Sequence, residues 1–543
     1  MIVSFAGAGP AALAENADHL RQLQTEAIAS NRSSAAHWGW NAENYTQWGT
    51  HSNRLIPVYT FGTKNAGEGI DLQSYTGANS TYRDEAALLH LYGRVPTNTV
   101  NAHAEYCDQT DVFRIQQAAL AAGKKHIILV VFDGMDWNTT RAAAIYKQQA
   151  IEYSEGRGRG LHFQDYTAAG TTQFGYMVTA PYSDGASVDV NAQQVKGASQ
   201  AFGGYDASRG GATPWQAPAG ADQYLSGQKT ADGLHHPYTD SACSATSMTA
   251  GIKSYNGSIN YSPDGRQVVT IAHAAQMQGY AVGAVSSVPV SHATPAAAYA
   301  HNVSRNDYQD ISRDLLGLPS SSHPEKPLPG LDVLIGGGYG SRRSKDNGQG
   351  SNFEAGNAYL ADSDLQRANV EQGGQYVVAV RTDGGGGYET LFDAVERAIQ
   401  GKHRLLGFYG VGAQKGHLPF ATANGDFQTA PSRTKNTETY SKNDVNDNPT
   451  LAEMSVAALR VLASRNDRFW LMVEAGDVDW ANHDNNLDNS IGAVLSGDAA
   501  VRTITDWVEQ NSSWDETVMI VTADHGHLLV LDDPAALIAP KSE

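Results

Sequence analysis

The chain has 543 residues, of which 41% are hydrophobic, and this composition is typical of a globular protein with a sizeable core. Its 57 Asp and Glu outnumber its 38 Lys and Arg, and the formal charge of -19 argues against a nucleic acid or an anionic membrane as a specific partner. The longest strongly apolar run covers only residues 126–132, which is too short to span a membrane.

Short apolar runs that are typical of buried strands alternate with helical stretches along the chain. The expected strands cover residues 126–132, 280–287, 331–337, 404–410, 468–473 and 517–523. Residues 450–463 are expected to form a helix, with Thr450 and Glu453 placed as a capping box. This alternation predicts an α/β fold with a mainly parallel central sheet.

Three of the expected strands run directly into an acidic residue. These residues are Asp133, Glu474 and Asp524. A buried parallel strand disfavours an unpaired carboxylate, whereas the carboxyl ends of strands are where open α/β sheets bind ligands. The three acids together therefore predict one shared site whose negative charge is compensated.

Histidines follow two of these acids at spacings that suit a metal ion. Asp479 and His483 are four residues apart, so on a helix they project from one face. The segment "ADHGH" places His525 and His527 directly after Asp524. Imidazole combined with carboxylate is common zinc chemistry, whereas two cysteines, Cys107 and Cys243, are too few for a Cys-rich site.

Two further segments carry groups that suit phosphate chemistry. In "TDSACSATSMTAG" (239–251), Ser241 follows Asp240 and is expected to begin a helix, although by itself this pattern is an ordinary helix cap. In "VSHATPAAAYAHNVSR" (290–305), His292 and Thr294 follow a strand, and Arg305 is expected at the far end of a helix. Arginine binds phosphate through two hydrogen bonds, although an isolated arginine is more often a surface residue.

Together these segments resemble the alkaline phosphatases. The motifs that carry the resemblance occur in the family's order: "DGM" (133–135), "TDSACSAT" (239–246), "HATPAAAYAHNVSR" (292–305), "VEAGDVDWANH" (473–483) and "TADHGH" (522–527). "LIGGG" (334–338), "LLGFYG" (405–410) and "NPTLAEM" (448–454) extend it over most of residues 120–530. The resemblance implies a three-layer α/β/α sandwich, with loop insertions near 187–235 and 336–357.

The resemblance also implies a catalytic centre with two Zn²⁺ and one Mg²⁺. The first zinc would take Asp479 and His483, and the second would lie among Asp133, Ser241, Asp524 and His525. The magnesium would take Asp133, Thr294 and Glu474, with His292 nearby through water. His292 and Trp480 stand where some members have Asp and Lys, which leaves the magnesium affinity open. His527 would support a zinc-bound carboxylate, and Asp240 would flank the nucleophile.

The first zinc of this family takes one further histidine from well downstream of the "ADHGH" motif, yet no histidine follows His527. Upstream, "THSNRLIPVYTFG" (50–62) and "DQTDVFRIQQAAL" (108–120) resemble the family's C-terminal segments in their usual order. We therefore expect a circularly permuted chain in which His51 is the missing ligand. Residues 50–120 would be the permuted segment, 121–543 the remaining core, and 1–49 a rim segment, all within one domain.

The expected reaction is the hydrolysis of small phosphate monoesters through a phosphoserine at Ser241, assisted by Arg305. A phosphodiesterase or sulfatase of the same superfamily is an alternative, although "DSACSAT" lacks the C/S-x-P-x-R pattern of sulfatases. A non-catalytic metal- or phosphate-binding relative is another alternative. Members of the family are usually exported, which favours the periplasm or secretion, although the first Lys or Arg is Arg21 and no clear signal peptide is present. The oligomeric state stays open, with a homodimer as one candidate.

Overall fold

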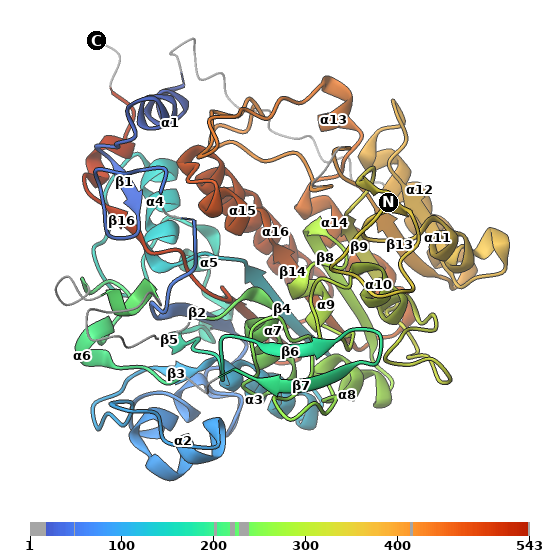
Figure 1. Cartoon of the computed structure of the whole chain (residues 1–543), viewed down its shortest axis with the longest axis horizontal. Coiled ribbons are helices and arrows are strands. Elements are labelled where there is room, and N and C mark those ends of the chain that lie inside the picture. Colours follow the sequence, from blue (N-terminus) through green and yellow to red (C-terminus); the bar gives the residue numbers. More distant parts are fainter. Residues whose placement is uncertain are drawn as a thin grey trace.

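The computed structural model describes residues 18–47, 49–199, 203–217, 223–226, 238–412 and 416–540, and a ten-stranded sheet lies at its centre (Figure 1). The strands in spatial order are β12 (Tyr376–Val380), β13 (Arg404–Phe408), β9 (Val333–Gly337), β8 (Ala281–Pro289), β14 (Phe469–Ala475), β4 (His126–Phe132), β15 (Thr517–Thr522), β2 (Ile56–Phe61), β5 (Gln173–Val178) and β3 (Cys107–Asp108). The strands from β12 to β15 are parallel, whereas β2 is antiparallel to both of its neighbours.

The central strands are buried on both faces. Every residue of β4 and of β14 is buried, as expected for parallel strands that helices cover on either side. Two groups of helices pack within themselves and against the sheet. One group contains α3 (Gln109–Ala121), α7 (Ser241–Ala250), α8 (Ile271–Met277) and α9 (Ala293–Ala297). The other contains α4 (Trp137–Gln148), α5 (His162–Asp165), α12 (Gly387–Gly401), α14 (Leu451–Arg465), α15 (Asp477–His483) and α16 (Leu487–Asn511). The expected α/β sandwich is therefore confirmed.

The remaining elements lie outside this frame. The helices are α1 (His19–Ser30), α2 (Glu85–Tyr92), α6 (Ala207–Gly210), α10 (Tyr308–Leu316), α11 (Asp362–Ala368) and α13 (Lys442–Asn446). Two-stranded pairs are β1 (Ala36–Trp38) with β16 (Leu529–Leu531), β6 (Ala186–Asp189) with β7 (Gln194–Ala198), and β10 (Arg342–Arg343) with β11 (Gly356–Asn357). Short 3-10 helices cover Leu72–Ser74, Gly77–Asn79, Thr81–Arg83, Ala168–Gly170, Gln223–Ser226, Val370–Gln372 and Pro534–Leu537. Within the described ranges, no helix is both long and apolar enough to cross a membrane.

The expected strands at 126–132, 280–287, 331–337, 404–410, 468–473 and 517–523 are all present, with small shifts at their ends. The capping box before α14 is also confirmed, because Thr450 and Glu453 bond reciprocally to each other's backbone. The expected helix up to Arg305 is wrong, since α9 already ends at Ala297. Beyond α9 the chain pairs instead with Ile259, whose backbone exchanges two hydrogen bonds of 3.0 Å with Asn302.

The segment before β2 packs against the rest of the structure at two places, through α1 and through β1. Helix α1 packs against α16, where Gln24 bonds to the backbone of Asn485 and Leu487. Strand β1 pairs antiparallel with β16, and its residue Trp38 is buried. Residues 1–17 and Trp48 of the predicted rim segment lie outside the described residues, as do 200–202, 218–222 and 227–237 of the expected insertion near 187–235.

A short turn connects α3 to β4. Helix α3 ends at Ala121, and β4 begins at His126. In the turn, Gly123 has a φ of 75°, a left-handed conformation that glycine adopts without strain, and the next amide, of Lys124, donates to Ala119 O at 3.0 Å. The connection between α3 and β4 is therefore a tight turn formed by the residues that end the helix.

A buried ion pair links α3 to the segment that follows α7. Lys253 Nζ lies 3.0 Å from Asp108 Oδ2, and both side chains are fully buried. The other oxygen of Asp108 accepts from Thr110 N and caps α3. The two segments are thus fixed to each other through one carboxylate.

We predict that Lys253→Ala lowers the free energy of unfolding by about 3–5 kcal/mol, because it leaves the Asp108 carboxylate buried without its cation. Urea denaturation should show a smaller loss for the double variant Asp108→Asn/Lys253→Met, in which neither charge remains. The exposed pair of Lys125 with Glu516 provides the control, and Lys125→Ala should cost far less than Lys253→Ala. Equal losses for the two lysine variants would contradict the prediction.

Candidate active site

The three acids predicted at strand ends lie together. Asp133 follows β4, Glu474 is the penultimate residue of β14, and Asp524 lies just beyond β15, and these three strands are neighbours in the sheet. All three side chains are fully buried. Gly134 N donates to Asp524 Oδ1 at 2.9 Å, and only glycine fits there, because a Cβ would lie 2.8 Å from His527 Nε2.

Burial and mutual repulsion make these carboxylates hard to ionise. Burial raises the pKa of Glu474 to about 8 and that of Asp524 to about 6, and the Asp479 charge adds to both shifts. Burial, together with the charges of Asp524 and Asp479, raises the pKa of Asp133 well above its usual range. The cluster therefore favours any cation that enters it.

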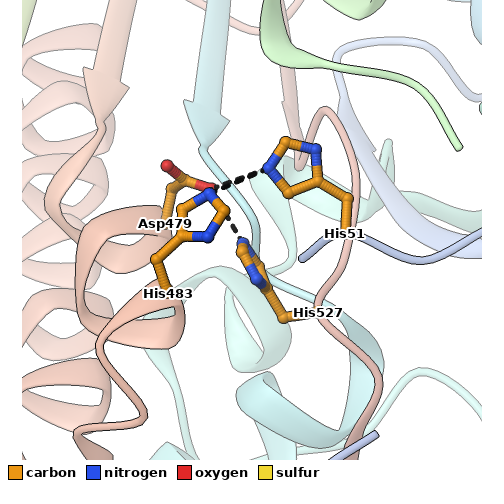
Figure 2. Close-up of side chains that lie close together, drawn as sticks. All are labelled: His51, Asp479, His483 and His527. Carbon is orange, nitrogen blue, oxygen red and sulfur yellow. Dashed lines mark hydrogen bonds and ion pairs between the residues drawn. The ribbon is translucent and has the colours of Figure 1, made fainter. Parts of the chain in front are cut away.

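A second cluster surrounds the carboxylate of Asp479, which α15 presents together with His483 on one helical face (Figure 2). Asp479 Oδ1 lies 2.8 Å from His527 Nε2, 3.4 Å from His483 Nε2 and 3.6 Å from His51 Nε2. Burial opposes ionisation of Asp479, but the histidines outweigh it and hold its pKa well below the usual range. The ligand atoms of all four residues lie within 4.8 Å of one another.

The geometry of two imidazoles calls for a positive centre between them. His51 Nδ1 lies 2.9 Å from Thr239 O, and His483 Nδ1 lies 2.8 Å from Gly49 O. Carbonyl oxygens only accept, so each Nδ1 donates and each neutral ring keeps its lone pair on Nε2. The two Nε2 atoms nevertheless face each other at 3.0 Å. A metal ion or a proton must therefore lie close to them, and a backbone carbonyl behind each ring is the usual support of a metal ligand.

Ser241 is the first residue of α7, whose N-cap is Asp240. Its Oγ lies 3.2 Å from His525 Nε2 and 3.5 Å from Asp133 Oδ1. His525 in turn stacks on His51, with ring centroids 3.6 Å apart. The hydroxyl thus lies at a helix N-terminus, which favours negative charge, and against the ligands that the sequence predicts for the second zinc.

Arg305 faces the same space as Ser241. Both residues line a cavity of about 340 Å³, together with His51, His292, Asp479, Trp480, His483 and Asp484. Arg305 Nη1 donates to Asp240 Oδ2 at 2.9 Å. Burial alone would lower the pKa of Arg305, but the Asp240 charge outweighs it and raises the pKa. A permanent cation therefore lines the same cavity as the hydroxyl of Ser241.

The predicted magnesium ligands leave three buried oxygen atoms without a hydrogen bond among the described residues. These atoms are Asp133 Oδ2, Thr294 Oγ1 and Glu474 Oε1. Three oxygen donors suit a hard divalent cation such as Mg²⁺, so the residues fit that group. His292 lines the cavity with its ring 5.5 Å from that of Trp480, and burial lowers its pKa to about 3.

The structure adds supporting groups that the sequence analysis did not identify. Ser286 Oγ donates to Glu474 Oε2, and Ser287 Oγ donates to Asp477 Oδ1 at 2.6 Å. The carbonyls of Thr239 and Gly49 orient two histidines, as described above. A serine near a strand end is a weak sequence signal, and a backbone carbonyl gives none.

A family model described as alkaline phosphatase matches residues 205–536, which is more than half of the chain. The chain belongs to the alkaline phosphatase family. The matched range includes Ser241, Arg305 and Asp479, whereas His51 and Asp133 lie outside it.

Similar proteins include three named bacterial enzymes. Alkaline phosphatase 3 of Bacillus subtilis (strain 168) is 28% identical over 312 residues, which cover 57% of this chain and 54% of the relative. Alkaline phosphatase H of Pseudomonas aeruginosa (strain UCBPP-PA14) is 32% identical, with 56% and 62% covered, and alkaline phosphatase of Escherichia coli (strain K12) is 30% identical, with 53% and 58% covered. The chain thus spans little more than half the length of these relatives.

Similar solved structures are also alkaline phosphatases. The Thermus thermophilus enzyme has a TM-score of 0.43 and 23% identity, and the likeness covers 74% of this chain and 60% of that chain. The cold-active enzyme from a psychrophilic Shewanella sp. has a TM-score of 0.42 and 21% identity, with 74% and 68% covered.

We predict that Glu474 makes metal-free protein less stable as the pH rises. A carboxylate whose pKa is raised in the folded state stabilises the fold only while it is protonated. For Glu474 this contribution is complete below its unfolded pKa of 4.5 and is lost as the pH rises to about 8. Buried histidines such as His292 and His527, whose pKa burial lowers, gain stability over part of this range, so Glu474→Gln is the reference. Between about pH 5.5 and pH 8.5, chelator-treated wild-type protein should lose several degrees of melting temperature relative to Glu474→Gln.

Added Zn²⁺ and Mg²⁺ should remove most of this loss. A difference in melting temperature between chelated wild-type protein and Glu474→Gln that does not change over this range would contradict the prediction.

Proposed function

We propose that this protein hydrolyses phosphate monoesters through a phosphoserine at Ser241. The observation that carries the proposal is the juxtaposition around the cavity, where the Ser241 hydroxyl lies at a helix N-terminus between buried metal-ligand candidates and Arg305. A phosphoryl group bound in this cavity would therefore contact a nucleophile, an anion-binding arginine and cations held by the candidate ligands.

The donor sets support two zinc ions and one magnesium ion. Asp479, His483 and His51 would hold the first zinc, and Asp133, Asp524 and His525 the second. Asp133, Thr294 and Glu474 would hold the magnesium, with His292 nearby through water. When bound, such cations lower the pKa of coordinated oxygens and neutralise the charge that develops on phosphoryl oxygens.

The chain's own residues have distinct parts in the proposed reaction. Arg305 binds two non-bridging oxygens of the phosphate and so places phosphorus in front of Ser241. Ser241 Oγ gives up its proton and bonds to phosphorus while the ester oxygen–phosphorus bond breaks, and the leaving alcohol takes up a proton. A water molecule then bonds to phosphorus, the Oγ–phosphorus bond breaks, and Ser241 regains its proton. The N-terminus of α7 favours the negative charge on Oγ throughout.

Supporting residues would keep this geometry fixed. His527 donates from Nε2 to Asp479 Oδ1, the oxygen that also faces His51 and His483, and so fixes the orientation of that carboxylate. Asp240 holds Arg305 through Nη1 in the absence of substrate. Trp480 and His292 form one side of the cavity, edge to face.

We also infer that the chain is circularly permuted relative to its family. The proposal is supported by the contact of His51 with Asp479 and His483, since these residues lie at opposite ends of the sequence. It is supported further by the turn of residues 122–125, which joins α3 to β4 directly. In an unpermuted chain the two termini would lie at this turn. The chain would instead run on without a break from the "ADHGH" segment to the segment of His51.

Hydrolysis of phosphate diesters is the second candidate. The presence of both Ser241 and Arg305 favours monoesters, because a guanidinium that binds two non-bridging oxygens suits a doubly charged monoester better than a singly charged diester. By resemblance to the family, we further expect periplasmic or secreted placement, and a homodimer stays one candidate for the assembly.

We predict that Ser241→Ala lowers the rate of aryl phosphate monoester hydrolysis by at least about a thousandfold, because no other hydroxyl replaces Oγ. Ser247→Ala is the matched control, since Ser247 lies on the same helix and bonds only to its own turn, and it should retain most of the activity. Wild-type turnover of an aryl diester should be far slower than that of the monoester. Full activity of Ser241→Ala, or faster diester turnover, would refute the proposal.

We predict that His51→Ala loses one equivalent of zinc per chain and at least about tenfold in turnover, because the first zinc keeps only two protein ligands. Elemental analysis after dialysis against Zn²⁺ measures the occupancy. His37→Ala serves as the control, because His37 pairs with Asp532 at 2.7 Å, away from the cavity. Unchanged zinc content and turnover in His51→Ala would refute the ligand assignment.

A further inference from the structure

Another group of side chains that could hold a metal ion lies outside the candidate active site. It contains His301, in the loop after α9, Asp314, on α10, and His323, in the loop after α10. One ligand atom from each of these three residues lies within 4.8 Å of the other two. None of the three lines the cavity of Ser241.

His301 presents a ring nitrogen that has no protein partner. Its side chain is buried, with only 6% of the residue exposed. Nε2 lies 2.8 Å from Val268 O and therefore donates to it, which leaves the lone pair on Nδ1. Among the described residues, Nδ1 makes no hydrogen bond. In a histidine that binds a metal, one ring nitrogen usually donates to a carbonyl oxygen, and the other keeps a free lone pair for the ion.

Asp314 is fully buried, and its orientation is fixed. Its Oδ2 accepts from His301 N at 2.9 Å, and its Oδ1 accepts from Ser320 Oγ at 2.5 Å. His323 Nδ1 lies 3.0 Å from Oδ1 and 3.2 Å from Oδ2. One backbone amide and one hydroxyl thus donate to the carboxylate, and its third partner is the imidazole of His323.

His323 opens the cluster to solvent. Its side chain is 13% exposed, whereas that of Asp314 is completely buried. Burial lowers the pKa of His301, so that this ring is neutral at pH 7 and its lone pair is available. The cluster therefore combines two imidazoles with one carboxylate, and its His323 side is partly exposed.

We propose that His301, Asp314 and His323 bind a divalent cation of the zinc class, with water from the His323 side as a further ligand. Two imidazole nitrogens and one carboxylate oxygen are a common ligand set of zinc, whereas Mg²⁺ and Ca²⁺ prefer oxygen ligands alone. Binding through His323 Nδ1 requires that the proton now shared with Asp314 leave this nitrogen, and Nε2 of the same ring can carry it.

The position of the cluster suggests what the cation does. His301 precedes Asn302, which pairs with Ile259, and the same loop continues to Arg305. Arg305 N in turn donates to Gly257 O at 2.8 Å. A cation held by His301 would fix the start of this loop to α10 and to the segment around His323. The proposed site is therefore structural, and it does not depend on the function proposed for Ser241.

The first test measures zinc bound per chain after dialysis of the complete protein against Zn²⁺. His323→Ala should hold one equivalent less than wild-type protein, because the cation then keeps only two protein ligands. His403→Ala is the matched control, since His403 is also partly buried but lies outside the cluster, and it should bind as much zinc as wild-type protein. Equal zinc content in wild type and His323→Ala would overturn the proposal.

The second test needs no variant and therefore does not depend on folding of a mutant. Crystals of wild-type protein grown with Zn²⁺ should show an anomalous peak at the zinc edge, at about 2.0–2.1 Å from ring nitrogens of His301 and His323. Peaks at Asp479 and His483 would show that zinc has entered the crystal. Their presence without a peak at His301 would overturn the proposal, and neither result depends on phosphatase activity.

Discussion

Three carboxylates that end neighbouring strands impose the central constraint of this structure. Asp133, Glu474 and Asp524 are fully buried side by side, and burial, together with the charge of Asp479, raises the pKa of each. Two of the nearby histidines cannot supply the missing positive charge, since burial lowers the pKa of His525 well below its usual range and that of His527 to about 3. Burial opposes a charge on His51 too, but Asp479 raises its pKa, and one such charge cannot balance all of these acids. Cations from solution are the remaining way to hold the ionised acids together.

The groups around this cluster support one another across the sheet. Thr239 O orients His51, and Ser241 follows only two residues later at the start of α7. The same loop therefore positions a proposed metal ligand and the proposed nucleophile. Arg305 is connected to it through Asp240, so the binding of phosphate and the placement of the hydroxyl depend on one short stretch of backbone.

The sequence predicted those parts of the site that local chemistry determines. A carboxylate directly after an apolar run identified Asp133, Glu474 and Asp524, and helical spacing identified Asp479 with His483. The early end of α9 was missed because it depends on pairing of Asn302 with Ile259, a contact between distant segments. The carbonyls behind the histidines, and the cluster around His301, were missed for the same reason, since neither forms a motif along the chain.

The order of segments along the chain also determines when the site can form during synthesis. His51 Nε2 and His483 Nε2 lie 3.0 Å apart, yet 432 residues separate them in sequence. Strand β2 can pair with β5 early, but its other neighbour, β15, leaves the ribosome hundreds of residues later. A growing chain must therefore leave one edge of β2 and the imidazole of His51 without these partners until α15 and β15 have been made. Closing so long a loop is slow, so the contact between His51 and His483 forms only after the central strands between them exist.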